Sequence, residues 1–99
     1  MDAKTVLRKV LRYYSIDFYE ICTEARSLEL NKARNFYFQL CKEFVYVKYD
    51  YTGQYSLKAI GEAINRPHCT VLSNWKLFKK KAKNEAYLME YEELKEIFN

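Results

Sequence analysis

Residues 56–83, with the sequence SLKAIGEAINRPHCTVLSNWKLFKKKAK, decide the fold of this 99-residue chain. Leu57, Ile60 and Ile64 recur at the spacing of one helix face, and the residues between them are mostly polar or small. This pattern predicts a short helix over residues 57–64.

A second, longer helix follows in the same stretch. Asn65 can cap it, and Arg66 and Pro67 are expected to begin it, because proline favours the first position of a helix. Its apolar residues repeat at helical spacing and predict a core stripe, which consists of Val71, Leu72, Trp75, Phe78 and Ala82. A short helix, a tight turn and a longer helix with polar groups in its first turn form a helix-turn-helix over about residues 56–83.

The composition supports a single all-α domain. Hydrophobic residues make up 49% of the chain, which is enough to bury one core over residues 1–99. Only 2 Gly and 1 Pro occur, and this scarcity of turn residues favours long helices over a many-stranded sandwich or barrel. It also excludes the Gly-rich loops that bind phosphate in nucleotide-dependent enzymes. We therefore expect a compact bundle of about six helices.

Upstream of residues 56–83 the apolar periodicity predicts three further helices. The first covers residues 5–14 and the second covers residues 18–25. The residues expected on the inner face of the second helix are Phe18, Ile21, Cys22 and Ala25. Asn31 is expected to cap the third helix, which runs from residue 32 to about residue 45.

Residues 45–55 differ from the rest of the chain, because β-branched and aromatic residues alternate there and Thr52-Gly53 can make a turn. We expect an inserted Tyr-rich loop with some extended structure. Its tyrosines are expected to pack over the edge of the core, and a platform on which nucleic-acid bases stack is the alternative. Downstream, the spacing of apolar residues predicts an acidic helix over residues 86–98.

The charges are unevenly distributed along the chain. Residues 56–84 carry seven Lys and Arg against one Glu, whereas residues 85–99 carry five Glu against one Lys. A basic block of this kind is typical of a protein that neutralises phosphates, and a solvated helix face is the alternative. The sequence contains no recognisable pair of nucleophile and base and no paired carboxylates, so we do not expect an enzyme.

Three cysteines, Cys22, Cys41 and Cys69, form an odd set without a Cys-x-x-Cys pair. This usage predicts reduced thiols in a cytoplasmic protein. His68 and Cys69 are adjacent but lack a second pair of ligands, so we expect neither a metal nor another cofactor. The N-terminal segment is amphipathic and no long apolar run occurs, so we expect neither a signal peptide nor contact with a membrane.

The first turn of the longer helix carries the residues expected to read DNA. In a helix-turn-helix the second helix enters the major groove end-on, so its first turns reach the base edges. His68 and Thr70 can form hydrogen bonds with bases, and Cys69 can contact a thymine methyl group. Ser73 and Lys76 follow one and two turns further on, where contact with the DNA backbone is expected. The alternatives are that His68 caps its own helix and that Cys69 packs in the core.

The block from Ser56 to Leu72 resembles the C-terminal DNA-binding domain of the bacterial replication initiator DnaA. The pattern of that family reads Ser-Leu-x-x-Ile-Gly-x-x-Phe-Gly-Gly-Arg-Asp-His-Thr-Thr-Val-Leu. Here Ser-Leu-x-x-Ile-Gly-x-Ala-Ile is followed, after one Asn, by Arg-Pro-His-Cys-Thr-Val-Leu. Pro67 stands where the family has Asp, and Cys69 stands where it has Thr. The similarity extends in the same order from Val6 to Lys81.

The resemblance implies a monomeric module that binds double-stranded DNA at a short asymmetric box, in replication initiation or its regulation. It assigns a contact in the minor groove to Arg34, with Lys32 as its basic partner. It also places the residues of the family's recognition turn, which here are Arg66, Pro67, His68, Cys69 and Thr70. Ser73 falls where the family often has a His that contacts the DNA backbone.

An alternative of a different class is a protein–protein interaction module that kept the fold but lost DNA binding. Its working surface would be the Tyr-rich loop over residues 45–55 or the acidic helix over residues 86–98, and its partner would be another protein. Replacing Lys79 and Lys80 by Glu would reduce the nucleic acid that co-purifies with the chain only if it binds DNA.

Overall fold

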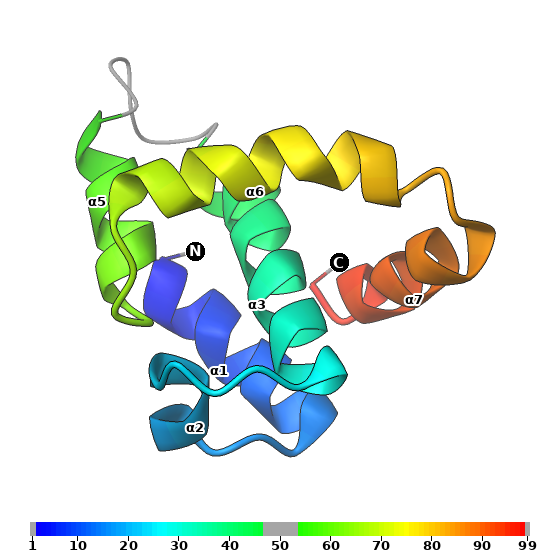
Figure 1. Cartoon of the computed structure of the whole chain (residues 1–99), viewed down its shortest axis with the longest axis horizontal. Helices are drawn as coiled ribbons and strands as arrows, with labels where there is room; N and C mark the ends of the chain where they lie inside the picture. The colour runs from blue at the N-terminus through cyan, green and yellow to red at the C-terminus, as the bar shows by residue number, and fades with distance from the viewer. Residues whose placement is uncertain (1, 47–53, 99) are drawn as a thin grey trace.

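The structure is a computed structural model that describes residues 2–46 and 54–98. Over these residues the chain forms six α-helices, one π-helical turn and no strand, which confirms the expected all-α fold (Figure 1). The elements in chain order are α1 (Ala3–Tyr14), α2 (Phe18–Cys22), α3 (Leu28–Cys41), η1 (Lys42–Tyr46), α5 (Gln54–Glu62), α6 (His68–Lys81) and α7 (Glu85–Glu96).

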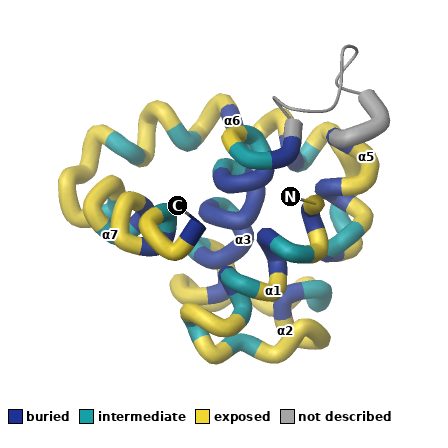
Figure 2. Tube along the Cα trace, turned by 180° about the vertical axis from the view of Figure 1, so that it is seen from behind, coloured by how far each residue is buried: buried dark blue, intermediate teal, exposed yellow. Residues whose placement is uncertain are grey.

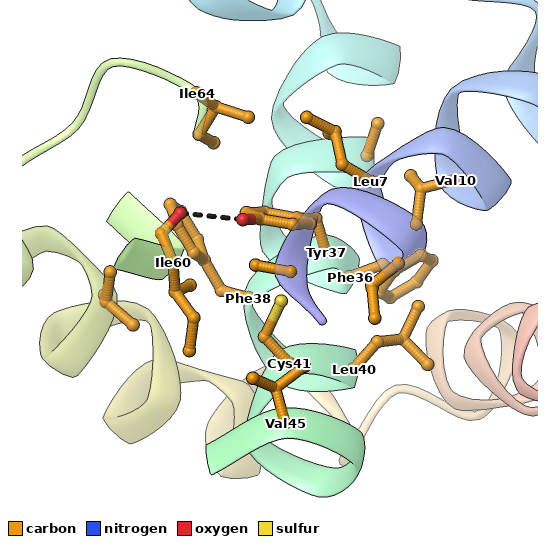
Figure 3. Close-up of a cluster of buried hydrophobic side chains, with 14 of the residues drawn as sticks. Leu7, Val10, Phe36, Tyr37, Phe38, Leu40, Cys41, Val45, Ile60 and Ile64 are labelled. Atoms are coloured by element: carbon orange, nitrogen blue, oxygen red, sulfur yellow. Dashed lines mark hydrogen bonds between the residues drawn. The ribbon is translucent and has the colours of Figure 1, made fainter. Parts of the chain in front are cut away.

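Helix α3 runs through the centre of the bundle, and Figure 2 shows it as the most continuously buried element. Every apolar residue from 33 to 41 is buried. The Tyr37 hydroxyl donates a hydrogen bond to the carbonyl oxygen of Ile60 over 2.7 Å (Figure 3). The indole N–H of Trp75 donates to the carbonyl oxygen of Phe38, also over 2.7 Å. These two buried bonds hold α5 and α6 against the same central helix.

Helix α1 has a defined cap at each end. The Asp2 carboxylate accepts a hydrogen bond from the Thr5 N–H over 2.8 Å, so the helix begins two residues before the predicted start. At the other end Ser15 adopts a left-handed conformation with φ of 55°, and the N–H of Ile16 donates back to the carbonyl oxygen of Leu11. This closure is typical of helix ends, and it turns the chain toward α2.

Helix α3 begins earlier than the sequence predicts. The hydroxyl of Ser27, and not the side chain of Asn31, accepts a hydrogen bond from the N–H of Leu30 and caps the helix. Both residue types are favourable caps. The earlier cap adds a turn that buries Leu30, although Leu28 stays 89% exposed. At its other end α3 stops at Cys41, and the chain continues as the π-helical turn η1.

Helix α2 is shorter than predicted, because it ends at Cys22. A helix of five residues can direct only one side chain fully into the core, and that residue is Ile21. Phe18, which was expected on the inner face, is 55% exposed, and Ala25 lies beyond the helix and is exposed. The prediction of the inner face is therefore confirmed for Ile21 and for Cys22, which is half-buried against the core, and is wrong for Phe18 and Ala25.

Most of the predicted insertion at residues 45–55 lies outside the described residues. Val45 belongs to η1 and α5 begins at Gln54, so the described ends of this stretch are helical instead of extended. The predicted packing of the tyrosines in this stretch over the core edge also lies outside the described residues. Helix α5 starts before the predicted residue 57 and ends at Glu62.

Helix α7 packs with one face on the bundle. Asn84 caps it by accepting a hydrogen bond from the Tyr87 N–H, so the helix begins one residue before the predicted start. Its buried residues include Tyr91 and Leu94. The Glu43 carboxylate, from η1, accepts hydrogen bonds from the Tyr91 hydroxyl and from the Lys95 ammonium group. The acidic helix is therefore anchored by a polar contact as well as by apolar packing.

Candidate nucleic-acid interface

The turn between α5 and α6 is built around a residue with positive φ. Asn65 has a φ of 59°, and its N–H donates to the carbonyl oxygen of Glu62. The N–H of Arg66 donates to the carbonyl oxygen of Gly61 over 2.8 Å. This pair of bonds is a Schellman motif, so Asn65 closes α5 instead of capping α6. Asparagine tolerates the left-handed region better than most residues, which explains its presence here.

The structure shifts the start of α6 by one residue relative to the prediction. Pro67 is the N-cap residue, with extended backbone and no capping hydrogen bond from its side chain, and His68 is the first residue of the helix. The Gly61 backbone lies so close to this turn that a Cβ atom on it would overlap the carbonyl oxygen of Arg66. Glycine at position 61 is therefore what allows the turn to pack against α5.

Helix α6 has one buried face and one exposed face. Val71 and Trp75 are buried against the bundle, as the core stripe predicted, although Leu72 from that stripe is 40% exposed. The residues of the recognition turn lie at the N-terminal end of α6, where Pro67, His68 and Cys69 are exposed and Thr70 is half-buried. Further along the same helix Ser73 and Lys76 are exposed. The structure thus brings six of the predicted site residues together on one accessible surface, named here the α6 surface.

Arg34 lies away from solvent, which differs from the expectation for a residue that contacts DNA. Its side chain is 6% exposed. Its Nε donates to the carbonyl oxygen of Ile21 over 3.0 Å, and its two Nη groups donate to the carbonyl oxygens of Ala25 and Thr23 over 2.8 and 3.0 Å. The edges of the guanidinium are occupied inside the protein, so the minor-groove contact predicted for Arg34 would require these hydrogen bonds to open. The physical cause is the end of α2, whose last carbonyl groups have no partner within that helix.

Arg66 is half-buried and is also bound to backbone oxygens. Its Nη1 donates to the carbonyl oxygen of Cys22 over 3.3 Å, and its Nη2 donates to that of Thr23 over 2.6 Å. Burial lowers the pKa of Arg34, and the positive charge of Arg66 adds to this effect. Arg66 therefore belongs to the interior support of the recognition turn rather than to its exposed part.

Lys32 is half-exposed and forms an ion pair with Glu90 from α7, with an Nζ to Oε1 distance of 3.0 Å. The Tyr14 hydroxyl donates to the other carboxylate oxygen of Glu90. Burial opposes ionisation of Glu90, but these two hydrogen bonds outweigh it, and the pKa of Glu90 is lowered. The structure therefore places Lys32 in a contact between α3 and α7, and not beside the first turn of α6.

A hollow of about 250 Å³ lies next to the α6 surface and contains residues that the sequence reasoning missed. Thr70 and Asn74 line it from α6, and Arg26 lines it from the segment that joins α2 to α3. Arg26 is exposed. The Asn74 side chain donates to the carbonyl oxygen of Thr70 over 2.9 Å. The available signal for Arg26 was its place in a polar segment between two helices, but nothing in the local sequence indicates that this segment packs near α6.

Among residues 2–46 and 54–98, no three His, Cys, Asp or Glu side chains come together in a way that would hold a metal ion. None of the helices in this part of the chain combines the length and the apolar character that a membrane crossing requires.

A short helix, a tight turn and a longer helix with an exposed polar first turn define a helix-turn-helix DNA-binding domain. The family model described as the bacterial dnaA protein helix-turn-helix matches residues 3–77, and the chain belongs to this family. The resemblance to DnaA is thereby confirmed, and it supports DNA binding rather than catalysis. None of the curated proteins compared with the chain matches it.

Proposed function

We propose that this protein binds double-stranded DNA in a sequence-specific manner, with the N-terminal end of α6 in the major groove. In this proposal His68 and Thr70 form hydrogen bonds with base edges, and Cys69 makes apolar contact with a thymine methyl group. Ser73 and Lys76 contact the DNA backbone and set the position of the helix. A function in replication initiation or its regulation fits the family.

The exposure of the first turn of α6 carries this proposal. Pro67, His68 and Cys69 are exposed, while Trp75, about two turns further along α6, is 7% exposed and bonded to α3. A rigidly anchored helix with an exposed polar end is the geometry that groove insertion needs. The free backbone N–H groups of that end and the helix dipole favour a phosphate oxygen close by.

Arg26 takes the place of Arg34 as the arginine directed to DNA. Arg34 and Arg66 also line the hollow beside α6, but Arg26 is the exposed one of these three arginines, so it can reach a part of the duplex next to the one read by α6. Lys32 forms an ion pair with Glu90, so it contributes less to DNA affinity than the exposed lysines do.

The test is selection of bound sequences from a random duplex library, followed by fluorescence anisotropy with the selected duplex at low salt. His68→Ala should weaken binding to the selected duplex by about 1–3 kcal/mol, as expected for a base contact. Lys76→Ala should weaken binding to all duplexes alike. Arg12→Ala removes one exposed positive charge from the last turn of α1 and is the matched control, with little effect. The absence of any enriched sequence would overturn the proposal.

The alternative, a protein–protein interaction module, has one feature in its favour. The outer face of α7 exposes Glu85, Glu92, Glu93 and Glu96 around Met89, which is 63% exposed. The other surface predicted for this alternative, the Tyr-rich loop, lies mostly outside the described residues. Lys79→Glu with Lys80→Glu discriminates between the two functions, because it should abolish retention of nucleic acid without affecting a partner bound through α7.

A further inference from the structure

Two arginines from distant parts of the chain converge on one loop. The loop covers residues 23–27 and joins α2 to α3, and it is named here the α2–α3 loop. Arg34 reaches it from α3, and Arg66 reaches it from the turn before α6. The Nη2 groups of both side chains donate to the same atom, the carbonyl oxygen of Thr23, over 3.0 and 2.6 Å.

Most of the remaining bonds of the two side chains involve the same short part of the chain; the exceptions are bonds from Arg66 to the carbonyl oxygens of Ile64 and Asn65 in its own turn and from Arg34 to the side-chain oxygen of Asn31. Arg34 also donates to the carbonyl oxygens of Glu20, Ile21 and Ala25. Arg66 also donates to that of Cys22. These atoms include the last carbonyl groups of α2, which a helix cannot satisfy by itself. The two guanidinium groups therefore complete the end of α2 and bind it to two other elements at once.

The hydrogen bonds of Arg34 and Arg66 form only when the α2–α3 loop holds its carbonyl oxygens in the right positions. Burial and the like charge of Arg66 both act against the ionised form of Arg34, and neither arginine forms an ion pair with a carboxylate in the described residues. The charged hydrogen bonds to carbonyl oxygens must therefore compensate for the free energy of burying two like charges close together. The planar guanidinium can bridge several carbonyls at fixed angles, whereas a lysine ammonium group cannot. A displacement of the α2–α3 loop would break several of these bonds together.

The position of Arg66 links the loop to the first turn of α6. Its backbone N–H is held by the carbonyl oxygen of Gly61 over 2.8 Å, and the next residue, Pro67, is the N-cap of α6. Its side chain meanwhile holds the α2–α3 loop. A change in the loop therefore reaches the start of α6 through a single residue.

We propose that Arg34 and Arg66 are positioning residues for DNA recognition, which clamp the α2–α3 loop so that Arg26 and the first turn of α6 keep a fixed relative orientation. This inference rests on the proposed function. Neither arginine contacts the duplex itself. They keep Arg26 and the first turn of α6, which are far apart in the sequence, at a fixed spacing, so that both can contact the duplex at the same time.

The experiment uses Arg34→Lys and Arg66→Lys, which keep the positive charge but lose the planar geometry. The dissociation constants for the selected duplex and for an unrelated duplex are measured at a temperature where circular dichroism shows each variant folded. The dissociation constant for the unrelated duplex divided by that for the selected duplex should fall by about tenfold or more, while binding to the unrelated duplex changes by less than about twofold. Hydrogen exchange should accelerate together at the hydrogen-bonded amides of Thr23 and Ala25 in the loop and of Arg66 and Thr70 at the start of α6.

Tyr14→Phe is the matched control for a purely structural role. It removes the hydrogen bond from Tyr14 to Glu90, between α1 and α7, and leaves the clamp intact. It should lower stability without changing the ratio. If the lysine variants behave like Tyr14→Phe, the positioning role is wrong and the proposed function stands. If the wild-type protein itself binds both duplexes equally, the proposed function fails, and the role of the clamp in recognition fails with it.

Discussion

Replacing Gly61 by Ala tests the packing of the helix-turn-helix most directly. Gly61 is buried in the last turn of α5. A Cβ atom there would overlap the carbonyl oxygen of Arg66 and lie 3.3 Å from the carbonyl carbons of Arg66 and Pro67. These are backbone atoms, so they cannot move aside as the end of a flexible side chain could. The substitution must separate α5 from the turn.

The expected change in stability is the difference between two opposing effects. Helix propensity alone would make Gly61→Ala stabilising by about 1 kcal/mol. Overpacking against a backbone that is fixed at both sides costs about 1–3 kcal/mol, and the hydrogen bond from the Arg66 N–H to the Gly61 carbonyl oxygen is also strained. We expect a net loss of about 1–2 kcal/mol, which corresponds to a decrease in Tm of about 4–16 °C for a domain of this size.

Urea unfolding followed by the fluorescence of Trp75, which is buried in the native state, measures this change. Ala59→Gly is the control, because Ala59 is exposed on the same helix and should lose only the propensity contribution of about 1 kcal/mol. A Gly61→Ala protein as stable as the wild type, or more stable, would refute the steric argument. It would mean that the turn before α6 does not lie against α5 as described.

Three further predictions concern a cap, a carboxylate and the thiols. Ser27→Ala removes the hydrogen bond that caps α3 and should cost about 1 kcal/mol in thermal or urea unfolding; an unchanged stability would contradict the cap assignment. The pKa of Glu90 is lowered in the folded state, so its stabilising effect is complete above the ordinary pKa of Glu and is lost as the pH falls through the lowered value. Glu90→Gln should therefore flatten the acid limb of a stability profile measured from about pH 6 to pH 3, and a limb that keeps its slope would be evidence against it. Cys69 is exposed, whereas burial raises the pKa of the Cys22 and Cys41 thiols. An aromatic disulfide reagent should therefore modify Cys69 first, and the selected duplex should protect it; equal rates with and without DNA would contradict contact at the first turn.

The sequence was informative where a local pattern repeats. The apolar residues of α3, α5 and α6 recur at helical spacing, so the central helix and the helix-turn-helix were predictable from periodicity. Trp75 in the core follows from the same pattern. His68 lies seven residues before it on the same side of the helix, so its exposure comes from its place at the helix end and not from periodicity. Element ends were less predictable, because Ser27 and Asn31 are both favourable caps and only tertiary packing selects between them.

The role of Arg34 was not predictable from local sequence. The family resemblance predicts that Arg34 faces DNA, but Arg34 is buried beside the end of α2 and donates to its carbonyl groups. That end exists only in the folded chain. Arg26 was also not predictable from the local sequence. It lies near Thr70 only because the α2–α3 loop folds back toward α6.

Two guanidinium groups that are bound inside the protein also lower the number of counterions released when the protein binds a duplex. Each DNA phosphate that a protein cation neutralises releases about 0.9 condensed counterion. Arg34 and Arg66 keep their hydrogen bonds inside the protein, so they release no counterions. Lys32 keeps its ion pair with Glu90. The slope of log affinity against log salt should therefore match the exposed lysines of α6 together with Arg26, and it should be shallower than the number of basic residues in the sequence would indicate.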